Sequence, residues 1–103
     1  MDYNIGMLMI ERTDDFDAWL VAFKDRVAQK QILARLDRLA DGHWGDCKSF
    51  DDIIELRFHL SAGYRIYCWQ EADVVVLLLC GGNKSSQKRD ITKAKKMIAL
   101  LKG

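Results

Sequence analysis

The sequence predicts a single α+β domain with the element order β-α-α-β-β-β-α, in which a twisted antiparallel sheet packs on a pair of helices. Two patterns lead to this prediction. Apolar residues recur at helical spacing over residues 16–39 and again over residues 91–101. Between these stretches, residues 54–70 alternate between apolar and polar side chains, as half-buried strands do. The length of 103 residues suits one domain, residues 1–103, around one core.

The first part of the chain is expected to form one short strand and two helices. Residues 7–11 are a short, mainly apolar segment, as expected of an edge strand. Thr13 and Asp25 are predicted helix caps, because their side chains can accept hydrogen bonds from the first N–H groups of a helix. Each cap precedes a stripe of apolar residues that would face the core: Phe16, Trp19, Leu20 and Phe23, then Ala28, Ile32, Leu36 and Leu39.

A turn joins the second helix to the sheet. Residues 41–46 contain two glycines, which end the helix and redirect the chain. We expect Trp44, within this turn, to close the end of the core. Asp51 and Asp52 come next, and we expect them to bend or bulge the following strand before Ile53.

A β-hairpin is predicted from the alternation that follows. Two alternating segments, residues 54–60 and 64–70, flank the short turn Ser61-Ala62-Gly63. A three-residue loop would place His59 opposite Arg65 and Arg57 opposite Tyr67. One face of the sheet would then stay open and carry the polar and aromatic side chains Glu55, Arg57, His59, Arg65, Tyr67 and Trp69.

The last part of the chain is predicted to be a central strand followed by a helix. Residues 74–80 are apolar throughout, which is typical of a strand covered on both faces. The turn over residues 81–84 contains two glycines and leads into the helix, which Ser85 or Ser86 would cap. N–H groups at such a turn can bind an anion. The expected buried stripe of this helix is Ile91, Ala94, Met97, Ile98 and Leu101.

The net charge of +1 conceals two halves of opposite sign. Residues 1–55 hold twelve acidic and seven basic residues, a net charge of −5. Residues 56–103 hold three acidic and nine basic residues, a net charge of +6. We therefore expect one basic end that suits a phosphate group or an acidic partner.

Cysteine usage and hydropathy exclude several classes of protein. Cys47, Cys68 and Cys80 form no CxxC pair, so no metal site and no cofactor are predicted. Cys68 and Cys80 fall at inward strand positions and are predicted to be core residues. No apolar run approaches the roughly 18–20 residues that span a bilayer. A cytoplasmic protein without a membrane partner is the expectation.

Several motifs in a fixed order resemble the RelE/ParE toxin superfamily, most closely its phage Gp49-like, HigB-type branch of addiction module killer proteins. The motifs are Leu-Ser-Ala-Gly-Tyr-Arg over residues 60–65, the apolar strand, and Gly-Gly-Asn-Lys-Ser-Ser-Gln-Lys-Arg-Asp-Ile over residues 81–91. The resemblance implies a RelE-like fold. It also implies a toxin that arrests translation as a metal-independent endoribonuclease acting on ribosome-bound mRNA.

The resemblance also assigns site residues. Arg65 matches the strand arginine of RelE-type ribonucleases, while Arg57 and His59 fall where those enzymes carry two lysines. Lys84 and Lys88 fall near their basic residues after the strand, and Asp90 replaces their helical tyrosine. The implied catalytic set is Arg65, Arg57, Lys84, His59 and Asp90. The implied substrate-binding set is Lys48, Tyr67, Gln87 and Lys88.

Three of these roles have alternatives that the sequence leaves open. Histidine is the side chain best suited to proton transfer near neutral pH, so His59 could serve in it, but it could also be an exposed strand histidine without a role. Asp90 could act as a general base, or it could cap the last helix or pair with an arginine. Tyr67 and Trp69 could stack on nucleobases, or they could pack beneath a loop or a partner.

Partners are likewise implied by the resemblance. They are a separately encoded helix-turn-helix antitoxin of the HigA type, the ribosome and its mRNA, and operator DNA that is contacted through the antitoxin complex. Two other functions stay open at this point. ParE-type relatives inhibit DNA gyrase by binding it, and a degenerate member could act only as an antitoxin-binding module.

Overall fold

The computed structural model describes residues 7–60, 62–73 and 75–103, which form a five-stranded sheet and three α-helices. Ser61 of the predicted turn and Val74 of the predicted strand lie outside the described residues. In chain order the elements are β1 (Met9–Arg12), α1 (Asp14–Val21), α2 (Arg26–Ala40), β2 (Cys47–Phe50), β3 (Ile53–Arg57), β4 (Arg65–Glu71), β5 (Val75–Gly82), the short 3-10 helix η1 (Lys84–Ser86) and α3 (Gln87–Lys102). The predicted α+β class is confirmed, but the predicted order β-α-α-β-β-β-α is one strand short, because the expected second strand is two strands, β2 and β3.

The sheet is mixed, so the prediction of a purely antiparallel sheet is wrong. The strand order is β1-β5-β4-β3-β2, and β1 runs parallel to β5 while the other neighbours are antiparallel. Asp51 and Asp52 do more than bend a strand, because they form the turn between β2 and β3. Asp51 adopts a left-handed backbone conformation with φ 54°, which aspartate tolerates better than most residues.

Helices α1 and α2 cover one face of the sheet, as predicted. Both predicted caps are confirmed: Thr13 accepts a hydrogen bond from the N–H of Phe16, and Asp25 accepts from the N–H groups of Val27 and Ala28. The two helices bury their apolar stripes against the inward residues of the sheet. This core contains Phe16, Leu20, Ile32, Leu36, Leu39, Leu56, Ile66, Cys68, Val76 and Leu78, with Trp44 packed against its edge.

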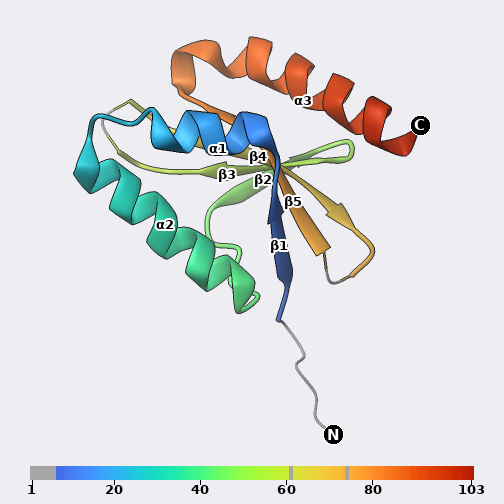
Figure 1. Ribbon diagram of the computed structural model, residues 1–103, viewed down its shortest axis with the longest axis horizontal. Helices are drawn as coiled ribbons and strands as arrows, with labels where there is room; N and C mark the ends of the chain where they lie inside the picture. Colours follow the sequence, from blue (N-terminus) through green and yellow to red (C-terminus); the bar gives the residue numbers. More distant parts are fainter. Residues whose placement is uncertain (1–6, 61, 74) are drawn as a thin grey trace, which may run out of the picture.

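Helix α3 covers the second face, so the expectation that this face stays open is wrong. Figure 1 shows α3 and α2 on opposite sides of the strands. A second core lies between α3 and the sheet, and it consists of Ile53, Tyr67, Leu79, Cys80, Ala94 and Ile98. Leu101, predicted to be buried, is 51% exposed. Among the described residues, no helix is long and apolar enough to cross a membrane.

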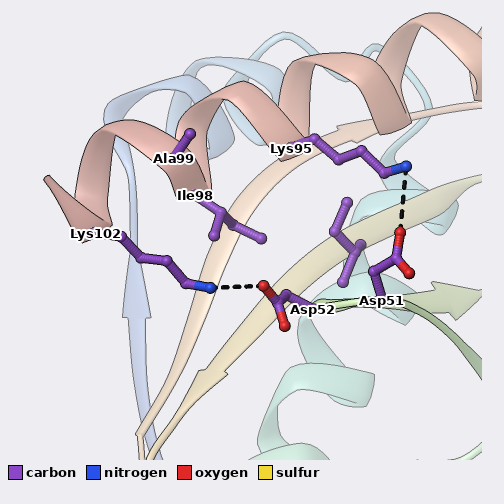
Figure 2. A pocket seen from close by; sticks show the side chains of 7 residues that line it. Asp51, Asp52, Lys95, Ile98, Ala99 and Lys102 are labelled. Atoms are coloured by element: carbon purple, nitrogen blue, oxygen red, sulfur yellow. Dashed lines mark hydrogen bonds and ion pairs between the residues drawn. The ribbon is translucent and has the colours of Figure 1, made fainter.

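Both ends of α3 are fixed to the sheet. At its start, Ser86 occupies the N-cap position of α3 but makes no capping hydrogen bond with its side chain, and Asn83 caps the preceding η1 by accepting hydrogen bonds from the N–H groups of Ser85 and Ser86. Near its end, two lysines reach the turn between β2 and β3 (Figure 2): Lys95 Nζ lies 3.5 Å from Asp51 and Lys102 Nζ lies 2.6 Å from Asp52. These pairs are exposed, so each adds little to stability.

The cysteines give a test of this arrangement. Cys68 and Cys80 are buried, as predicted, and burial raises the pKa of the Cys80 thiol to about 11, while Cys47 is exposed on β2. Since the thiolate is the reactive form, we expect a maleimide reagent to label Cys47 alone in the native protein and all three cysteines in denaturant. Mass spectrometry of labelled peptides checks this, and native labelling of Cys68 would contradict the fold.

Candidate active site

Two arginines face each other across the hairpin. The register pairs Arg57 with Arg65 and Glu55 with Tyr67, which differs by two residues from the predicted pairing of His59 with Arg65. The predicted three-residue loop, which set Leu60 against Tyr64, is wrong, since the N–H of Phe58 donates to the carbonyl of Tyr64. Like charges directly opposite each other are destabilising in a sheet. Carboxylates near both arginines offset this repulsion.

Asp46 is the carboxylate that holds Arg57. Its Oδ1 lies 3.0 Å from Nη2 of Arg57, and its Oδ2 lies 2.6 Å from Nε2 of His59. The hydrogen bond from His59, and then that from Arg57, lower the pKa of Asp46 below its ordinary value. Asp46 therefore stays ionised at neutral pH and connects an arginine to a histidine that is 84% exposed.

Glu55 performs the corresponding role for Arg65, from beneath α3. Its side chain is fully buried, with Oε2 lying 3.5 Å from Nε of Arg65 and accepting a hydrogen bond from Gln87 Nε2 at 2.9 Å. Arg65 also donates from Nη1 to the carbonyl of Gly63 at 2.7 Å. A buried carboxylate is costly unless it is paired, and these contacts partner Oε2, while Oε1 has no hydrogen-bond partner among the described residues. Neither contact of Arg65 uses Nη2.

Arg35 of α2 fixes the backbone beneath the site. Its guanidinium is buried and donates to three carbonyls: Nη1 to Arg57, and Nη2 to Trp44 and Asp46, at 2.6, 3.0 and 2.6 Å. It also lies over the ring of Phe58, 4.7 Å from its centroid. Burial lowers the pKa of Arg35, although an arginine remains charged in proteins. This side chain joins the end of β3 to the loop that carries Asp46.

A cavity of about 480 Å³ lies at the end of the hairpin. Arg57, His59, Arg65 and Lys84 line it together with Asp46, so it brings together four of the five predicted catalytic residues. Lys84 is placed there by η1 and by a backbone hydrogen bond from its N–H to the carbonyl of Ala62. Gly63 has φ 63°, and a Cβ on it would lie 3.2 Å from Lys84 Cβ and 3.3 Å from Arg65 Nη1. The positive φ and the close approach of the Lys84 and Arg65 side chains therefore favour glycine here.

The other predicted residues lie outside this cavity. Asp90 is buried in the first turn of α3 and accepts a hydrogen bond from Ser86 Oγ, so it stabilises the start of the helix rather than facing the cavity. Tyr67 is fully buried under α3, and burial, followed by the charge of Glu55, raises its pKa. Its ring is therefore not placed to stack on a base.

The three remaining residues surround the site at a distance from the cavity lining. Gln87 reaches inward to Glu55. Lys48 is exposed on β2, with Nζ 5.0 Å from the ring centroid of Phe50. Lys88 lines a separate surface hollow on α3 with Arg89, Lys93 and Lys96. Lys48 and Lys88 are thus surface cations beside the site, and Gln87 supports it from within.

Sequence reasoning missed Asp46, Arg35 and Glu55 as members of this arrangement. Asp46 lies in a turn seven residues before β3 begins at Ile53, and Arg35 lies on a helix whose other charged residues are exposed, so neither had a local signal. Glu55 had one, since it sits between the inward residues of a strand next to Arg57. Its position on the predicted open face made it look exposed, whereas α3 buries it.

The cavity presents cations and one histidine–carboxylate pair, which suits binding of a phosphate group and transfer of a proton. Among the described residues, no group of three or more histidine, cysteine, aspartate or glutamate side chains could hold a metal ion. Arginine offers a planar fork that matches phosphate oxygens, and lysine adds a point charge.

Comparison with known proteins identifies the family. Residues 18–101 match the family described as "Phage derived protein Gp49-like (DUF891)". A protein of Haemophilus influenzae (strain ATCC 51907 / DSM 11121 / KW20 / Rd), described as uncharacterized, is 46% identical over 89 residues, which cover 85% of this chain and 90% of that protein. The chain belongs to the Gp49-like family of phage-derived proteins, and the resemblance seen in the sequence is confirmed at that level. The matched region contains every residue that lines the cavity.

The role of Arg35 can be tested by stability. Arg35→Ala would leave three carbonyls without their donor and a gap beside Phe58, so we expect a loss of about 2–4 kcal/mol in the free energy of unfolding. Arg38→Ala is the matched control, because Arg38 is exposed one turn further along α2, and its loss should be within about 0.5 kcal/mol. Urea titration measures both. Equal stabilities of the two variants would contradict the anchoring role.

Proposed function

We propose that this protein is the toxin of a type II toxin–antitoxin pair, a HigB-type member of the RelE/ParE superfamily with a RelE-like fold. In this proposal it arrests translation as a metal-independent endoribonuclease that cuts ribosome-bound mRNA. The observation that supports it is the convergence of Arg57, Arg65 and Lys84 on one cavity whose wall also carries the His59–Asp46 pair.

The proposed reaction is attack of a ribose 2′-hydroxyl on the adjacent phosphorus. The new bond joins the 2′-oxygen to phosphorus, and the bond from phosphorus to the 5′-oxygen of the next nucleotide breaks. The products are a 2′,3′-cyclic phosphate and a free 5′-hydroxyl. Negative charge grows on the phosphorane oxygens, and the positions of Arg57 and Arg65 suit its stabilisation. Such preorganised cations need no metal ion for this task.

His59 is the residue best placed to take the proton of the 2′-hydroxyl. In the tautomer whose Nε2–H donates to Asp46, the Nδ1 atom is an acceptor. Protonation at Nδ1 creates an imidazolium, and the Asp46 carboxylate at 2.6 Å stabilises that charge. Lys84 lines the same cavity and is the proposed donor of a proton to the leaving 5′-oxygen. Asp90 has no part in this scheme, because it is buried and accepts a hydrogen bond from Ser86.

The proposed partners are those that the resemblance implies, and the basic charge of residues 56–103 suits them. The ribosome would present the mRNA, and a HigA-type antitoxin would neutralise the basic half of the chain, contacting operator DNA on behalf of the complex. Gyrase inhibition of the ParE type is the competing function. Brief induction followed by sequencing of RNA 5′ ends separates them: we expect new ends within codons of translated mRNA, whereas gyrase-dependent DNA breaks with intact mRNA would overturn the proposal.

Arg65 should be required for activity, and its loss should also lower the melting temperature, because it leaves the buried Glu55 carboxylate with Gln87 as its remaining partner. Arg65→Ala removes a cation from the proposed phosphate site, so we expect cleavage to fall by about 100- to 1,000-fold, the effect of losing one oxyanion-stabilising donor. Arg65→Lys should restore only part of it, since a point charge replaces a fork. Growth arrest after induction and thermal melting measure the two properties. A folded Arg65→Ala variant that arrests growth as the wild type does would remove Arg65 from the site.

Cleavage should depend on the ribosome. Tyr67, one of the two aromatic residues predicted to stack on a base, is buried, and Phe58, the aromatic residue in the cavity lining, is buried with Arg35 over its ring, so the cavity offers charge rather than an exposed stacking surface. We therefore expect purified protein to cut mRNA in a translating mixture at least about 100-fold faster than the same mRNA alone, because the ribosome supplies positioning. Equally fast cutting of naked mRNA at physiological salt would contradict this.

A further inference from the structure

A second cavity continues the site toward α2. It measures about 370 Å³ and shares five lining residues with the cavity described above: Asp46, Arg57, Phe58, His59 and Leu60. Because these residues form a common wall, the two cavities adjoin along the segment that links β3 to the hairpin turn. We call the second one the α2 groove. Its outer wall is α2 itself.

One face of α2 provides this wall. Gln31, Ala34, Arg35 and Arg38 line the groove, and their spacing of three, four and seven residues places them on the same side of a helix. Arg35 is buried and forms the floor through its bonds to the backbone. Ala34 has a small side chain and leaves space above that floor. Gln31 and Arg38 are exposed at the two ends.

The charges of the joined surface favour an anionic ligand. The two cavities together are lined by Arg35, Arg38, Arg57, Arg65 and Lys84, against the single carboxylate of Asp46. That carboxylate is engaged by Arg57 and His59 on the shared wall. A chain that carries a phosphate at the first cavity and continues along the groove would therefore meet a second cation, Arg38.

We propose that the α2 groove binds the nucleotide next to the scissile phosphate of single-stranded RNA. This inference rests on the proposed function. Arg38 binds the next backbone phosphate, and Gln31 offers an amide donor and acceptor to a base or ribose edge. The geometry that supports this is the shared wall, since a ligand held between His59 and Arg57 is already at the entrance of the groove. Substrate contacts then come from α2 as well as from the hairpin.

Titration with short oligonucleotides at low salt tests the groove directly. The probe is a dinucleotide with a 2′-deoxy first ribose, which cannot be cut, and the same probe extended by one nucleotide at either end. Backbone amide signals of the protein report binding. We expect Gly63, Arg65 and Lys84 to shift with every probe, and Ala34 and Arg38 to shift only with one of the extended probes.

Charge variants give the second measurement. Arg38→Gln should weaken binding of the responsive extended probe by about 3- to 10-fold and leave the dinucleotide within about 2-fold, with a shallower salt dependence. Lys30→Gln is the control, because it removes the same charge from an exposed position of α2 outside the groove. It should change neither affinity by more than about 2-fold.

The outcomes separate this inference from the proposed function. If Gly63, Arg65 and Lys84 shift but Ala34 and Arg38 shift with none of the probes, the groove is not a nucleotide site while the first cavity stands. Equal effects of Arg38→Gln and Lys30→Gln also overturn the inference, because they indicate general charge attraction. If neither set of signals shifts and Arg65→Ala leaves cleavage unchanged, both proposals are wrong.

Discussion

The site depends on the hydrogen bonds that the buried guanidinium of Arg35 donates to the backbone. A charged group inside a protein is costly unless hydrogen bonds compensate for it, and Nη1 and Nη2 of Arg35 donate to three backbone carbonyls, while its buried Nε has no hydrogen-bond partner among the described residues. Those carbonyls belong to the turn after α2 and to the last residue of β3. Gly45 allows the approach: it has φ 69°, and a Cβ there would lie 3.0 Å from Arg35 Nε. Asp46 is thereby held next to the hairpin.

The hairpin places two arginines side by side, and Arg35 helps to make this possible by holding Asp46 in position. Arg57 and Arg65 are direct neighbours across two strands, which would repel each other in isolation. Asp46 stabilises one from the solvent side and Glu55 stabilises the other from beneath α3. Each arginine therefore has its own carboxylate, and the pair can stay close enough to bind a shared anion. Without one of these two carboxylates, one arginine would lose its ion-pair partner, and the two arginines would no longer be held side by side.

Helix α3 divides the second face of the sheet into a structural part and a chemical part. It buries Tyr67, Leu79 and Cys80 in a second core. The same helix also covers Glu55, to which its Gln87 side chain donates a hydrogen bond. The end of the hairpin lies outside the area that α3 covers, so Arg57, His59 and Arg65 border the cavity with Lys84. Burial of Glu55 and exposure of His59 are thus two consequences of where one helix begins.

The sequence by itself determined the three α-helices, most of the strands and most of the cation set, but not the division of the second predicted strand into β2 and β3. Periodicity identified α1, α2 and α3, and the caps Thr13 and Asp25 marked two of their starts, because these signals are local. Motif order identified the Gp49-like family, and four of the five predicted catalytic residues line one cavity.

Only the tertiary structure decided the hairpin register, the parallel pairing of β1 with β5 and the covering of the second face by α3. Each depends on contacts between residues far apart in the chain, for which the sequence carries no local pattern. For the same reason the sequence did not predict that Asp46 and Arg35 belong to the site, nor that Tyr67 and Asp90 are buried in the interior.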